Sequence, residues 1–96
     1  MHQLDKLKAQ RKEIYRIARK HRARKLYVFG SCARREETPE SDVDFLVEYN
    51  PHTSLLDHIK LQDDLEQFLQ TQVDLVSKNG IHRYIKDQVE KEAVEL

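Results

Sequence analysis

The pair Gly30-Ser31, followed along the chain by Asp42-Val43-Asp44, constrains the fold more than any other feature of this sequence. Four apolar, β-prone residues at 26–29 precede the glycine, which predicts a short buried strand that ends in a turn. Side chains alternate across a strand, so the two aspartates should share one face of a second strand while its apolar side chains share the other. The chain is therefore expected to form a sheet with one face in a core and carboxylates on the opposite face.

Apolar periodicity along the rest of the chain predicts an α/β (α+β) domain with the element order αβαβαβα. Helices are expected over residues 4–22, 31–35, 55–69 and 81–93, and strands over 26–29, 42–49 and 73–76. A length of 96 residues suits one domain with a real core and leaves no room for a second. We expect a single domain over 1–96, with a basic amphipathic helix in 1–24 and the core in 25–96.

The net charge of zero conceals an uneven distribution of charge along the chain. Residues 1–35 hold twelve Lys and Arg against two acids, whereas residues 36–96 hold five against fifteen acids. Such asymmetry can indicate a nucleic-acid surface. The basic residues here accompany an apolar helical stripe, so they form either a solvated helix face or an electrostatic docking face for a partner or a nucleotide triphosphate.

The cellular compartment is predicted from what the sequence lacks. Its start is charged and has no apolar signal segment, and no apolar run approaches the 18 or so residues of a membrane span. One cysteine, Cys32, excludes an internal disulfide and suits a reducing compartment. We therefore expect a cytoplasmic protein with no membrane contact. Its five histidines lack the spacing of a zinc site, and we interpret them as surface residues.

A Gly-Ser turn beside paired carboxylates favours phosphoryl or nucleotidyl transfer. A glycine that opens a helix lets backbone N–H groups reach a phosphate, and Ser31 adds a hydroxyl donor. Mg²⁺ binds one or two carboxylates together with phosphate oxygens, which suits Asp42 and Asp44. Taken singly, each feature could instead be an ordinary strand-to-helix turn or a pair of acids at a strand end. Their combination in one segment favours the functional interpretation.

Three further residues are candidates for the same site. Asp74 interrupts the apolar strand at 73–76, and if that strand lies beside the aspartate pair, three carboxylates could hold two metal ions. Asp74 could also accept the proton of an attacking hydroxyl, although a solvent-facing acid on an edge strand is the alternative. Arg34 and Lys78 are candidates for nucleotide phosphates. A solvated helix face is the alternative for Arg34.

These segments resemble the minimal nucleotidyltransferase (MNT) domains of the DNA-polymerase-β-like nucleotidyltransferase superfamily. The resemblance rests on Gly30-Ser31-Cys32-Ala33-Arg34, Ser41-Asp42-Val43-Asp44-Phe45-Leu46-Val47 and Val73-Asp74-Leu75-Val76, and covers roughly residues 25–96. It implies a small mixed sheet of about three strands flanked by helices. It also implies that Gly30 and Ser31 bind the triphosphate and that the three aspartates bind two Mg²⁺ ions.

The resemblance carries an expectation about function. Many stand-alone MNT proteins, including MntA-type members, are antitoxins encoded beside a HEPN-domain ribonuclease toxin. They transfer AMP from ATP to a hydroxyl of that toxin, typically of a tyrosine. We therefore expect a Mg²⁺-dependent protein adenylyltransferase that forms a complex with a HEPN toxin, with no direct contact to nucleic acid. The alternatives are an antitoxin that only occludes its toxin and a nucleotidyltransferase that acts on a small molecule.

Overall fold

The computed structural model describes residues 3–30, 42–78, 87, 89 and 91–96, and contains both helices and strands. They are α1 (Gln3–Ala9), α2 (Arg11–Lys20), β1 (Ala23–Phe29), β2 (Val43–Tyr49), α4 (Leu55–Leu69), β3 (Val73–Ser77) and β4 (Val94–Glu95). The helix predicted at 31–35 lies outside the described residues. So does most of the helix predicted at 81–93, of which residues 87, 89, 91 and 92 are described and helical.

The four strands form one mixed sheet in the order β3-β2-β1-β4. Strand β1 runs antiparallel to both β2 and β4, whereas β2 and β3 are parallel. The predicted α/β class and mixed sheet are confirmed, with four strands in place of about three. Strand β4 has two residues, which is too short for an alternating pattern to predict.

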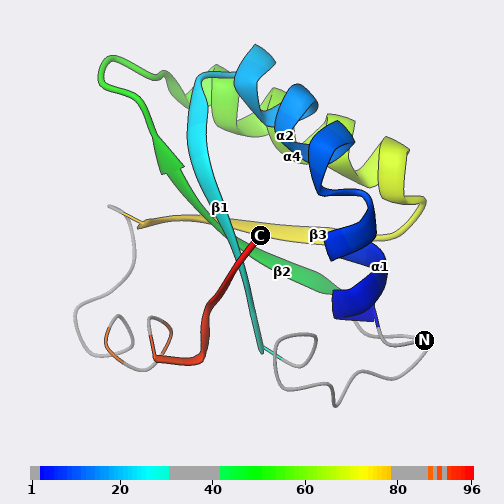
Figure 1. Ribbon diagram of the computed structural model, residues 1–96. Coiled ribbons are helices and arrows are strands. Elements are labelled where there is room, and N and C mark those ends of the chain that lie inside the picture. Colours follow the sequence, from blue (N-terminus) through cyan, green and yellow to red (C-terminus); the bar gives the residue numbers. More distant parts are fainter. Residues whose placement is uncertain (1–2, 31–41, 79–86, 88, 90) are drawn as a thin grey trace.

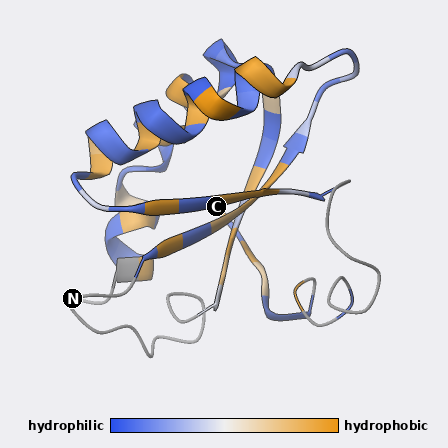
Figure 2. Ribbon diagram, turned by 180° about the vertical axis from the view of Figure 1, so that it is seen from behind, coloured by the Kyte–Doolittle hydropathy of each residue, from blue (hydrophilic) through white to orange (hydrophobic). Residues whose placement is uncertain are grey.

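Helices α2 and α4 lie side by side over one face of the sheet, as Figure 1 shows. The apolar face of β2, with Val43, Phe45 and Val47, is buried in the core beneath them. Leu61 and Leu65 of α4 are fully buried in the same core. Orange and blue bands alternate along the helices in Figure 2, as expected when each helix buries one side. Within the described segments, no helix is long and apolar enough to cross a membrane.

The basic segment predicted as one helix over 4–22 forms two helices that meet at Gln10. The backbone N–H of Gln10 donates to both Lys6 O and Leu7 O at 3.1 Å, a shared bond that tightens the end of α1. Both helices bury apolar side chains in the core: Leu4, Leu7, Ile14 and Ala18. The sequence shows no glycine or proline at the junction, so local propensity did not predict it.

Side chains of α4 occupy part of the outer edge of β3. Glu66 accepts a hydrogen bond from the Val73 backbone N–H at 3.0 Å, and Nε2 of His58 donates to Leu75 O at 3.0 Å. With Nε2 as the donor, the Nδ1 atom of His58 accepts from the Tyr49 hydroxyl at 2.7 Å. His58 is thus partly buried and bonded at both nitrogens. The prediction that the histidines are simply surface residues is wrong for His58, and also for His21, which pairs with Asp64 at 2.6 Å.

Tyr49 makes the stability of the fold sensitive to alkaline pH. Burial, aided by the negative charge of Asp57, raises the pKa of Tyr49 from its ordinary 10.0 to about 12. The unfolded chain therefore loses this proton at lower pH than the native protein, and stability declines as pH rises from about 10 towards 12. We expect the stability advantage of the wild type over Tyr49→Phe to shrink by about 1 kcal/mol between pH 9 and pH 11, after allowance for partial solvent exposure.

Urea unfolding of both proteins at the two pH values measures this difference. Comparison with Tyr49→Phe cancels the other groups that titrate in this range, because both proteins contain them. A constant difference between the two proteins across this pH range would contradict the prediction.

Candidate active site

A row of side chains crosses β1, β2 and β3 near one end of these strands, on the face opposite the core. Strand pairing aligns Phe29 of β1 with Asp44 of β2, and Asp44 with Asp74 of β3. Directly paired residues of adjacent strands project to the same side, and the strands lie about 4.8 Å apart. The structure therefore brings Asp44 and Asp74 together, as the sequence led us to expect if these strands were neighbours. Asp44 is half-buried and Asp74 is exposed.

Asp42 lies at the entry to β2, one residue before the strand begins. Its exposed side chain is two residues from Asp44, so extended backbone places both on the same face. The backbone N–H of the intervening Val43 donates to Gln72 O at 3.1 Å, which ties this point of the chain to the start of β3. The entry to β2 and the start of β3 thus hold all three predicted carboxylates at one end of these two strands.

Gly30 brings the glycine-serine turn to this row. It follows β1 with φ +72°, a conformation that L side chains rarely adopt. A Cβ atom at this position would collide with the carboxylate of Asp44. Only a residue without a side chain allows the backbone to approach the carboxylate so closely. Ser31 and Arg34, the other predicted ligands of this turn, lie outside the described residues.

The chemistry of these residues fits a Mg²⁺ site. In the part of the chain that the structure describes, no three His, Cys, Asp or Glu side chains already converge as a metal site would require. The fit rests instead on the donors: neighbouring strands present in-register carboxylates, which Mg²⁺ binds together with phosphate and water. Because Gly30 has no side chain, the Asp44 carboxylate can lie close against the backbone that follows β1.

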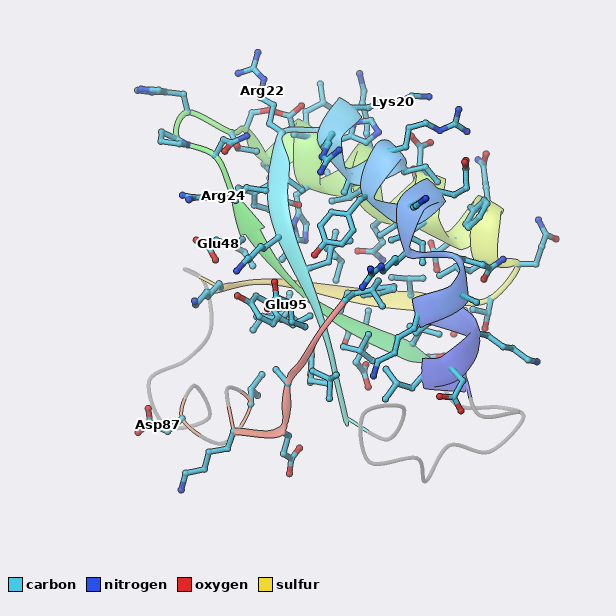
Figure 3. All side chains as sticks on the ribbon, in the orientation of Figure 1. Lys20, Arg22, Arg24, Glu48, Asp87 and Glu95 are labelled. Carbon is cyan, nitrogen blue, oxygen red and sulfur yellow. The ribbon has the colours of Figure 1, made fainter. Side chains whose placement is uncertain are left out.

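The structure separates Lys78 from the carboxylates. Lys78 lies four residues beyond Asp74, which is roughly 13 Å along an extended chain. Its Nζ atom is 3.8 Å from Glu48 and 5.7 Å from the centre of the Tyr27 ring. Figure 3 shows Glu48 and its other partner, Arg24, at the same side of the molecule. Contact of Lys78 with nucleotide phosphates stays a prediction.

A pocket of about 220 Å³ lies beside the carboxylate row, and our sequence analysis did not predict it. It is lined by Tyr27, Leu46, Lys78 and Ala93. Tyr27 and Leu46 are paired across β1 and β2, each two residues from the row of Phe29 and Asp44. Strand alternation could have assigned both to the carboxylate face, but only the pairing of the strands revealed a common pocket.

A family model and two curated relatives match most of this chain. The model described as a nucleotidyltransferase domain matches residues 4–96. MJ0435 of Methanocaldococcus jannaschii, named as a candidate protein adenylyltransferase, is 40% identical over 86 residues, 90% of this chain and 92% of that protein. The protein adenylyltransferase MntA of Thermococcus cleftensis is 42% identical over 71 residues, 74% of this chain and 72% of its own length.

Solved structures share the fold. One described as a candidate minimal nucleotidyltransferase superposes with a TM-score of 0.86 at 39% identity, covering 97% of this chain and 95% of its own. A toxin–antitoxin complex with AMP-PNP contains a chain with a TM-score of 0.75 at 22% identity, with 88% and 69% covered. A complex of tri-AMPylated Shewanella oneidensis HEPN toxin with MNT antitoxin gives a TM-score of 0.69 at 20% identity, with 92% and 69% covered. The last two similarities concern the fold alone.

Proposed function

This chain belongs to the nucleotidyltransferase domain family, and from that membership we propose that it transfers AMP from ATP to a hydroxyl of a partner HEPN toxin. Tyrosine is the acceptor we expect, and neutralisation of the toxin is the result. The observation that carries the proposal is the close approach of Gly30 to the Asp44 carboxylate, with Asp74 in register beside it. The names of the relatives support adenylyl transfer, and the complexes that share the fold support ATP and a HEPN partner.

In the proposed reaction, the acceptor oxygen attacks the α-phosphorus of ATP. A new P–O bond joins AMP to the acceptor, and the bond to the β-phosphate oxygen breaks to release pyrophosphate. The hydroxyl proton passes to a carboxylate, and Asp74, which is exposed and in register with Asp44, is the candidate that we favour. Asp42, Asp44 and Asp74 would hold Mg²⁺, which when bound stabilises the charge on attacking and leaving oxygens. Gly30 and Ser31 would bind the departing phosphates.

The pocket next to the carboxylate row gives the nucleoside part of ATP a place to bind. Leu46 lines this pocket with a buried apolar side chain and Tyr27 lines it with an aromatic ring. Each lies on its strand two residues from the pair of Phe29 and Asp44. Lys78 would then border the nucleoside end of the site. We expect the partner protein to deliver its acceptor hydroxyl to the carboxylate row.

Intact-mass spectrometry of the co-expressed partner tests the proposed function. We expect the partner to gain mass in multiples of one AMP group with the wild type and not with Asp42→Asn/Asp44→Asn. Asp63→Asn, an exposed substitution on α4, is the matched control and should support the same gain as the wild type. A stable complex without any gain would instead establish occlusion. If the partner neither forms a complex nor gains mass, a small-molecule acceptor would be favoured.

A further inference from the structure

A second feature, independent of the carboxylate row, is a basic groove of about 480 Å³ between α2, β1 and the end of β4. Five cationic side chains line it: Arg11, Lys12, Arg19, Arg24 and Lys25. The other described lining residues are Tyr15, Glu95 and Leu96, so one acidic side chain stands against five cationic ones in the described lining. Five of the twelve Lys and Arg residues in 1–35 thus line one concave part of the surface.

Among the described residues, most of these cationic side chains have no acidic partner. Lys25 forms an ion pair with Glu95 at 3.2 Å, and Arg24 lies 3.9 Å from Glu48. Arg11 and Lys12 are exposed and form no ion pair with any of the described residues. A groove with more cations than anions attracts a polyanion, and its concave walls strengthen that attraction.

The groove is also preorganised. Positions 11, 15 and 19 of α2 are each separated by four residues, so they form one row with a spacing of about 6 Å. Tyr15 at its centre is fixed by its hydroxyl, which contacts both the backbone N and O of Leu26, at 3.2 and 3.3 Å. The Arg19 guanidinium lies 5.9 Å from the centre of the Tyr15 ring. In Figure 3, Lys20 at the end of α2 and Arg22 just beyond it project outward from the molecule.

We propose that this basic groove binds the phosphate backbone of a single-stranded nucleic acid. Two cation-lined walls, one from a helix and one from a strand, can contact a single phosphate chain from both sides. Binding through Lys and Arg to phosphates depends little on base sequence, and the groove offers little else for recognition. The sequence alone led us to expect no direct contact with nucleic acid. The concentration of these cations in one groove is the structural reason to propose it.

An acidic protein segment is a less suitable occupant of the groove. Protein interfaces place apolar and aromatic anchors at their centres and leave charges at the rim. Here the aromatic Tyr15 is only half-exposed and is surrounded by cations, and the large apolar side chains that are exposed among the described residues lie on α4 instead, at Leu55, Leu56 and Ile59. A protein partner would find its anchors there, while the groove offers the charges that phosphates require.

Fluorescence anisotropy with a labelled twelve-nucleotide oligouridylate tests the proposal on the full chain. We expect the wild type to bind the oligonucleotide with an affinity that falls as salt is added. At low salt, the affinity of Arg11→Gln/Lys12→Gln/Arg19→Gln should be at least about tenfold weaker than that of the wild type. If each lost cation contacted one phosphate, the slope of log affinity against log salt would fall by about 2. The matched control Lys6→Gln/Lys8→Gln/Lys60→Gln removes equal charge from exposed positions outside the groove and should bind nearly as the wild type does.

Circular dichroism of both triple variants establishes that helix content is unchanged. Equal weakening in the groove variant and the control would overturn the proposal, because net charge rather than the groove would then explain binding. A twelve-residue polyglutamate that competes as strongly as the RNA would also overturn it, in favour of an acidic protein segment. Loss of RNA binding in the groove variant with AMP transfer intact would support the groove as a separate site.

Discussion

Replacing Asp44 with asparagine is expected to lower kcat/KM for AMP transfer by a factor on the order of a thousand. Asp44 lies at the centre of the row, between Phe29 and Asp74, and against Gly30. Asparagine preserves the shape of the side chain but removes the negative charge that a divalent cation requires. A thousandfold loss corresponds to about 4 kcal/mol of transition-state stabilisation, in the range seen when a preorganised charge at a transferring group is lost.

The measurement is the rate of label transfer from ATP to the purified partner, with the free energy of unfolding determined alongside. Because the substitution is nearly isosteric and Asp44 is only half-buried, we expect stability to stay within about 1 kcal/mol of the wild type. Asp63→Asn changes the same functional group on the exposed side of α4 and should leave the rate unaltered. Wild-type transfer by the Asp44→Asn protein would refute the assignment of this residue.

Gly30→Ala is expected to have the second largest effect, because it alters both the backbone and the carboxylate. An alanine held at φ +72° costs about 1–2 kcal/mol of stability. Its methyl group would also push the Asp44 carboxylate out of position. Since a displacement of about 1 Å can reduce catalysis on the order of a hundredfold, we expect transfer to fall by at least that factor even when the protein is fully folded.

A double-mutant cycle with Asp44→Ala separates the two causes. If the collision contributes to the loss of stability, Gly30→Ala should be less destabilising in the Asp44→Ala background, by about 0.5–1 kcal/mol or more. The remaining loss would measure the strain of the backbone alone. Losses that simply add would show that the methyl group and the carboxylate do not interact, and would contradict the geometry on which the site is built.

Local patterns in the sequence predicted several elements of this protein correctly. Alternation across residues 42–49 predicted a strand with an apolar face and an acidic face, and β2 has both. The strand predicted at 26–29 was expected to end before Gly30, and β1 does end at Phe29. The roles of Asp42, Asp44, Asp74 and Ser31 remain predictions. These successes concern neighbours in sequence, where side-chain direction follows directly from the backbone repeat.

Features that depend on distant pairs of residues required the tertiary structure. The sequence could not establish that Asp74 is in register with Asp44, since residues of β2 and β3 meet only after a long crossover through α4. Nor could it predict β4, the junction of α1 and α2, or the distance of Lys78 from the carboxylates. The basic residues were visible from the start, but their arrangement in one groove depends on how α2 packs against β1.

The sequence by itself therefore determined the chemistry available to this protein: paired carboxylates, a glycine turn and a basic N-terminal segment, each encoded in a few adjacent residues. Only the tertiary structure decided which of these residues act together. Strand register and helix packing are set by the burial of apolar side chains such as Val43, Phe45 and Val47 beneath the helices. The free energy of this burial is a sum over all residues of the core. No local segment contains that sum, so the positions of Asp74 and of the basic groove follow from the folded chain alone.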